Sequence, residues 1–156
     1  MYWIDVIRVA HVLSACVLIG TGTGIAFFMA MAHRTKDPGF IARTAGVVVI
    51  ADYLFTATTA IAQPITGTIL AVELGWSLAD GWLVASVGLY VLIGVFWLPV
   101  VFIQKHMQRE AHTSDAPQSA LSARYHRLFR IWLACGIPAF TAILVLLWLM
   151  VLRPGF

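Results

Sequence analysis

The sequence predicts an all-α protein, a bundle of four transmembrane helices with both termini on the outer, periplasmic side of the membrane. Three observations favour this fold: the composition, the four long apolar segments and the distribution of basic residues. Of the 156 residues, 61% are hydrophobic and 11% are charged. That balance is typical of a multi-span membrane protein. We therefore expect one membrane domain over residues 1–156, with the lipid bilayer as its surroundings.

The four apolar segments are each long enough to span the bilayer. A helix rises about 1.5 Å per residue, so roughly 20 residues cross a hydrocarbon core of about 30 Å. The spans are expected at about residues 4–31, 45–72, 82–103 and 131–152. Residues 104–130 are expected to form a cytoplasmic loop.

The basic residues predict the orientation. Eight of the ten lysines and arginines lie in the first and third connections, whereas the second connection has none and carries Glu73 and Asp80. Because cytoplasmic loops are enriched in Lys and Arg, the first and third connections are expected in the cytoplasm. Tyr125 and Trp132 flank the start of the fourth span and are expected to anchor it at the membrane interface.

The first span contains a histidine and a motif of small residues. His11 is the one histidine well inside a span, and Arg8 lies one turn before it on the same face. The arginine can extend toward the outer surface. Gly20 and Gly24 form a GxxxG motif, which allows close helix approach within the protein or between copies. A homo-oligomer or a partner in a membrane complex is therefore compatible with the sequence.

The second span carries a stripe of polar side chains. Residues at i, i+4, i+7, i+11 and i+14 share one face of a helix. The stripe consists of Asp52, Thr56, Thr59, Gln63 and Thr66. A carboxyl group at mid-membrane costs roughly 2.5–3.5 kcal/mol, so the stripe is expected to face inward, as a packing seam or as the wall of a site. Pro64 removes the backbone donor for the Ala60 carbonyl, and a kink is expected there.

The third span brings two more polar residues to the depth of His11. It runs inward from the outer side, which puts Ser86 and Tyr90 at a depth comparable to that of His11, and Gln63 reaches a similar level on the second span. We therefore expect His11, Gln63, Ser86 and Tyr90 to converge in the outer half of the bundle.

Three interpretations of His11 follow from this arrangement. It can be a structural residue hydrogen-bonded to Gln63 or Tyr90. It can be the axial ligand of a haem iron, with Arg8 pairing a propionate. It can also belong to a proton or cation pathway that uses Asp52. The other four histidines lie toward the cytoplasmic side, so a haem b would have one protein histidine ligand or a weaker second ligand.

Other common functional motifs are not present in the sequence. It has no Ser/His/Asp constellation, no CxxC motif, no phosphate-binding glycine loop after a strand and no basic face for nucleic acid. An enzymatic activity is neither indicated nor excluded by the residues.

Several stretches resemble one bacterial family over nearly the whole chain. The stretches ADYLFTATTAIAQPITG, FWLPVVFIQ, RYHRLFRIWLACGIPAF and LWLMVLRP resemble the predicted integral membrane proteins catalogued as domain of unknown function 2269. The resemblance implies a four-helix protein of the bacterial cytoplasmic (inner) membrane. It implies no activity.

A more distant similarity concerns the first span. The stretch IRVAH, residues 7–11, is similar to the first-helix motif of four-helix haem-binding protoporphyrinogen oxidases and of copper-resistance-D-like membrane domains. In those oxidases the histidine is implicated in haem binding, which implies the same for His11. They also use a lysine on the third helix, and Ser86 stands roughly at that place here.

Three functional hypotheses therefore remain. The first is a b-type haem-binding redox module with His11 as axial ligand. The second is a cofactor-free structural or assembly subunit of a membrane complex. The third is a proton or cation pathway through Asp52.

Overall fold

The computed structural model describes residues 2–113 and 121–154, and all regular structure in these ranges is helical. The elements are α1 (Tyr2–Thr35), α2 (Pro38–Ala51), the π-helical turn η1 (Asp52–Thr56), α3 (Ala57–Glu73), α4 (Gly81–Thr113) and α5 (Ala123–Leu152). Because α2, η1 and α3 form one unbroken rod, the protein has four helices long and apolar enough to cross a membrane. The predicted all-α, four-span fold is confirmed.

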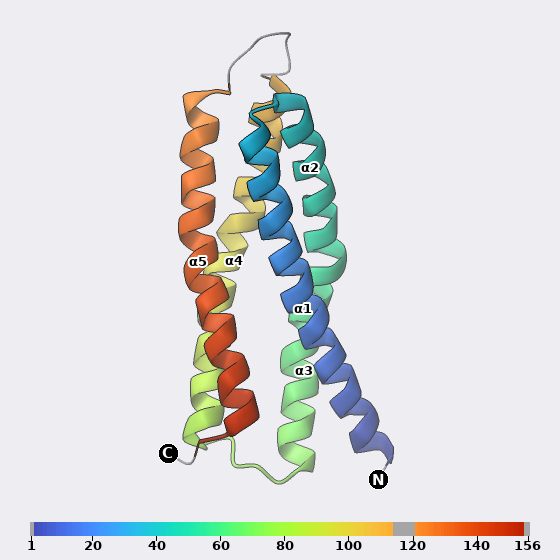
Figure 1. Ribbon diagram of the computed structural model, residues 1–156. Coiled ribbons are helices and arrows are strands. Elements are labelled where there is room, and N and C mark those ends of the chain that lie inside the picture. The colour runs from blue at the N-terminus through green and yellow to red at the C-terminus, as the bar shows by residue number, and fades with distance from the viewer. Residues whose placement is uncertain (1, 114–120, 155–156) are drawn as a thin grey trace.

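The four rods run up and down in alternation (Figure 1). Helix α1 packs against α2, η1 and α3, while α4 packs along α5 and against α2. Both ends of the chain and the connection from α3 to α4 lie at one end of the bundle. The turn between α1 and α2 lies at the opposite end, together with the end of α4 and the start of α5.

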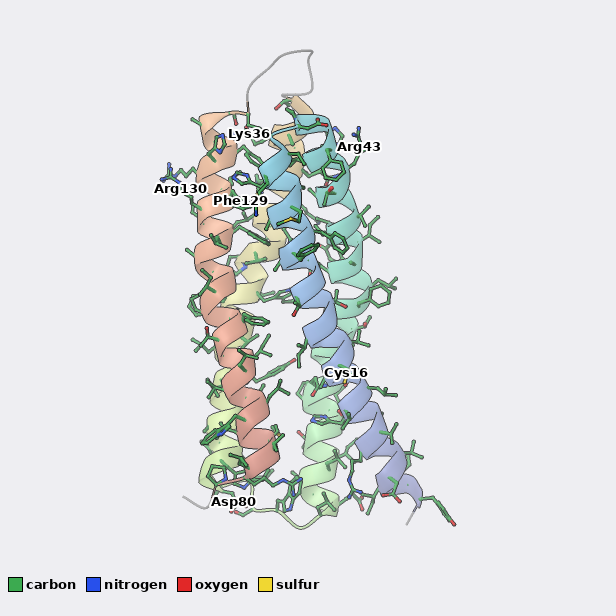
Figure 2. All side chains as sticks on the ribbon, viewed as in Figure 1. Cys16, Lys36, Arg43, Asp80, Phe129 and Arg130 are labelled. Carbon is green, nitrogen blue, oxygen red and sulfur yellow. The ribbon has the colours of Figure 1, made fainter. Side chains whose placement is uncertain are left out.

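The two ends differ in charge. Figure 2 shows Lys36, Arg43 and Arg130 at the end that contains the turn between α1 and α2, and Asp80 at the other. We call the first the basic end and the second the terminal end. The two connections rich in basic residues therefore meet at one end of the protein, as the sequence predicts. The side of the membrane that each end faces stays a prediction.

The helices continue beyond the apolar segments. Helix α2 begins at Pro38 because Asp37 caps it, accepting hydrogen bonds from the backbone N–H groups of Gly39 and Phe40. Helix α4 continues to Thr113, and Ser122 caps the start of α5. Much of the segment 104–130 is thus helical, because hydropathy marks contact with lipid and not the point where a helix ends.

The hydrophobic core lies at the basic end. It includes two residues that were expected at the membrane interface. Tyr125 and Trp132, expected as interfacial anchors, are 0% and 5% exposed. The reason is that α5 begins early, so that its aromatic face packs inside the bundle. His33 of α1 stacks on Phe129 with ring centroids 3.7 Å apart, and its Nδ1 lies 3.3 Å from the Tyr125 hydroxyl.

The terminal half is packed as two pairs of helices. Helix α1 packs on α3, and α4 packs on α5, whereas α3 makes no extended contact with α4 or α5. Arg153 at the end of α5 lies over the ring of Trp76, 4.3 Å from its centroid, and Trp76 contacts Trp82 edge to face. This cation–π contact links the C-terminal end of α5 to the connection before α4.

Candidate functional site

His11 lies at the contact between α1 and α3, where a hydrogen bond fixes its ring. Its Nδ1 is 2.7 Å from the hydroxyl oxygen of Thr66. That hydroxyl is also 2.7 Å from the Ala62 carbonyl, to which it donates its single proton. His11 therefore donates from Nδ1, and when its ring is neutral the lone pair lies on Nε2.

The backbone of His11 is held by two further side chains. The amide nitrogen of Gln63 donates to the His11 carbonyl at 2.9 Å and to the Ser14 hydroxyl at 2.7 Å. Ser14 in turn donates to the same carbonyl at 3.0 Å. These bonds join α1 to α3 at the turn that carries the histidine.

Gly67 leaves room for the imidazole ring. A Cβ atom at this position would lie 3.2 Å from Cε1 of His11, closer than ordinary van der Waals contact. The side chains of residues 11, 14, 63 and 66, together with Gly67, form what we call the His11 site. His11 itself is half-buried.

A second polar centre lies at the π-helical turn, where Asp52 faces α4. Asp52 is 3% exposed and Gln104 is 0% exposed. The indole N–H of Trp97 donates to Oδ1 of Asp52 at 3.3 Å. Thr56 and Gln104 also lie at the carboxyl group, but Oδ2 of Asp52, the Thr56 hydroxyl and both amide atoms of Gln104 lack a hydrogen bond of acceptable geometry within the described residues. We call these four residues the Asp52 site.

The π-helical turn divides the predicted stripe. The N–H of Ala57 bonds to the carbonyl of Asp52, five residues back instead of four. This wider turn changes the phase of the helix, so that Asp52 and Thr56 face α4 while Gln63 and Thr66 face α1. Thr59 donates to the Phe55 carbonyl within its own helix. Four of the five residues are thus divided between two sites, and Thr59 belongs to neither.

The family of predicted integral membrane proteins DUF2269 matches residues 5–154. The chain belongs to this family. No curated protein and no solved structure matches the chain. The family match covers both polar sites and identifies an integral membrane protein without assigning an activity. The more distant similarity to haem-binding oxidases and copper-resistance-D-like domains is not supported by these comparisons.

In this family member, Tyr90 and Ser86 do not bond to His11 or Gln63, although the four residues were expected to lie together. Tyr90 donates from its hydroxyl to the Ala60 carbonyl of α3, one turn before Gln63. Ser86 donates to the Trp82 carbonyl of its own helix at 2.7 Å. The structure therefore joins His11 to Gln63 directly, brings Tyr90 to the neighbouring turn of α3 and leaves Ser86 outside this hydrogen-bond network.

Arg8 lies near the terminal end and pairs with Asp5. The guanidinium is 3.1 Å from the Asp5 carboxylate, and both side chains are more than half exposed. Such a pair contributes little to stability because water screens it. Arg8 is therefore available to exchange its partner for another anion.

Three site residues were not identified from the sequence. Ser14 lies one turn after His11, and Trp97 and Gln104 lie seven residues apart, which is two turns of α4. Those spacings were the available signals. Gln104 stood at the start of the predicted loop, whereas the structure buries it inside α4. The described residues contain no group of three His, Cys, Asp or Glu side chains that could hold a metal ion.

Proposed function

We propose that this membrane protein binds a b-type haem, with Nε2 of His11 as the axial ligand. One observation carries the proposal: the His11 Nδ1–H donates to Thr66, whose own proton goes to Ala62. Histidines that ligate a metal typically donate their other N–H to a protein acceptor, which fixes both the tautomer and the ring. His11 is held in that state by residues of α3.

The residues around His11 fit such a ligand. Gly67 leaves space for the imidazole, the ring is half-buried, and no described residue makes a hydrogen bond to Nε2. Arg8, one turn away and exposed, would hold a propionate through its guanidinium in place of Asp5. When bound, haem supplies one-electron transfer. The chain contributes the ligand nitrogen, the anion partner and apolar surroundings in a bundle of helices.

The absorption spectrum of the detergent-purified protein, expressed with ample haem, tests the proposal. We expect a Soret band that His11→Ala largely removes while the variant stays helical and monodisperse. His106→Ala is the matched control, because this exposed histidine bonds, among the described residues, only to the carbonyl of Phe102 in its own helix. Haem-free wild-type protein, or a band that survives in His11→Ala, would overturn the proposal.

A cofactor-free structural role is the second candidate, favoured by the paired hydrogen bonds of Gln63. These bonds to Ser14 and to the His11 carbonyl join α1 to α3 without any ligand. In this case Gln63→Leu would lower stability with no change in the absorption spectrum. A spectrum that changes in Gln63→Leu would instead favour the haem proposal.

A further inference from the structure

The Asp52 site gathers buried polar atoms that lack partners. Five buried side-chain atoms have no hydrogen bond in residues 2–113 and 121–154: four belong to Asp52, Thr56 and Gln104, and the fifth is the Trp132 indole nitrogen. Buried polar groups are nearly always paired, so each exception requires an explanation. Thr56 and Gln104 lie at the Asp52 carboxyl group without hydrogen bonds of acceptable geometry to it, and four such atoms at one place favour a bound ligand.

The backbone is also unusual at this place. Asp52 and Thr56 are the first and last residues of the π-helical turn, and both are buried. A π-helical turn is rare and frequently occurs at functional sites. Here it turns a carboxylate and a hydroxyl toward Gln104 on the opposing helix α4.

The oxygen atoms of the Asp52 site favour a hard cation as the ligand. The unpartnered oxygens are a carboxylate, a hydroxyl and an amide oxygen. Oxygen sets of this kind suit hard cations, whereas the soft and borderline transition metals prefer nitrogen or sulfur.

The single carboxylate of Asp52 favours a cation that carries one positive charge. Asp52 makes no salt bridge among the described residues. The nearest lysine in sequence to Gln104, Lys105, holds its ammonium over the Tyr53 ring, 4.7 Å from the centroid. One carboxylate plus one monovalent cation is neutral, whereas a divalent ion would leave a net charge in an apolar bundle, where charge is costly.

We propose that Asp52, Thr56 and Gln104 bind a small monovalent cation, Na⁺, through Oδ2, the hydroxyl oxygen and the amide oxygen. Trp97 holds the other carboxylate oxygen in place through its N–H. This site is separate from His11 and does not rest on haem binding.

Thermal unfolding of the haem-free protein in detergent tests the site. NaCl is compared with choline chloride at matched ionic strength, because a ligand that binds only the folded state raises Tm with its concentration. We expect a rise in Tm with Na⁺ that choline does not produce. Asp52→Asn and Gln104→Leu should lose this rise. Glu73→Gln, the same kind of change at an exposed carboxylate, should keep it.

Thr56→Val is the second variant if Asp52→Asn does not fold, because valine matches threonine in shape and lacks the hydroxyl. It should shift the Na⁺ response to higher concentration. Equal Tm values in Na⁺ and choline would overturn the proposal and leave a protonated carboxyl as the neutral state of the site. A Na⁺ response retained in Asp52→Asn, or one that occurs at unchanged Na⁺ concentration in Thr56→Val, would overturn it as well.

Discussion

Ala60 has a backbone carbonyl that its own helix cannot satisfy. Pro64, four residues later, has no N–H to donate to it, yet α3 continues through this position. The hydroxyl of Tyr90 donates to that carbonyl from α4. A tyrosine on one rod therefore compensates for a proline on another, and the bond connects the two helix pairs in the terminal half.

This compensation predicts non-additive effects of two substitutions. Tyr90→Phe leaves the Ala60 carbonyl unpaired and should lower the free energy of unfolding by about 1–3 kcal/mol. In Pro64→Ala the new N–H takes over the carbonyl, so the added Tyr90→Phe change should cost much less. Equilibrium unfolding of the four proteins measures the coupling. Strictly additive effects would mean that the hydroxyl does not compensate for the proline.

Gly67 gives a second prediction at the residue scale. Gly→Ala in a helix interior gains up to about 1 kcal/mol from helix propensity. Gly88→Ala should show that gain, since a Cβ there meets nothing within 4 Å. Gly67→Ala should lose it and weaken haem binding, because the Cβ presses on the His11 ring at 3.2 Å. Unfolding curves and haem titrations compare the two. Identical behaviour of the pair would show that the ring can move aside freely.

At the scale of elements, the sequence predicted the membrane spans. It did not predict which direction the polar side chains of each span face. Four apolar runs identify four spans, and the constant rise per residue correctly matched His11 to Gln63 in depth. The π-helical turn could not be read from DYLFT, since these residues are equally compatible with an α-helix. Because of this turn, Asp52 and Gln63 face different helices. The residues of α4 next to Asp52, Trp97 and Gln104, could therefore not be predicted from the sequence.

Removing one residue from η1 should convert it to an α-helix, because a π-helical turn contains one extra residue. Leu54 is exposed, so its deletion loses no core packing. The deletion rotates Asp52 by about 100° relative to Gln63. We expect four spans to insert while either the Na⁺ response or haem binding is lost, as measured by Tm and absorption. Retention of both would show that the turn does not set the direction of the two sites.

At the scale of the whole molecule, the separation of charge predicts one orientation. The basic end should face the cytoplasm and the terminal end the periplasm. In a variant with alanine at positions 16 and 135, single cysteines replace Ser77 at the terminal end or Lys36 at the basic end, both exposed. A membrane-impermeant thiol reagent applied to intact cells should label position 77 alone. Labelling of position 36 alone would reverse the orientation.

Stiffness is unevenly distributed along the length of this bundle. At the basic end, stacked rings of α1 and α5 and the buried core join all the rods. At the terminal end, the helix pairs are joined by single contacts such as those of Tyr90 and Arg153. We therefore expect that the α1/α3 pair separates from the α4/α5 pair at the terminal end more readily than the rods separate at the basic end. Backbone amide protons of residues that face that seam should therefore exchange sooner than those of residues at the basic end.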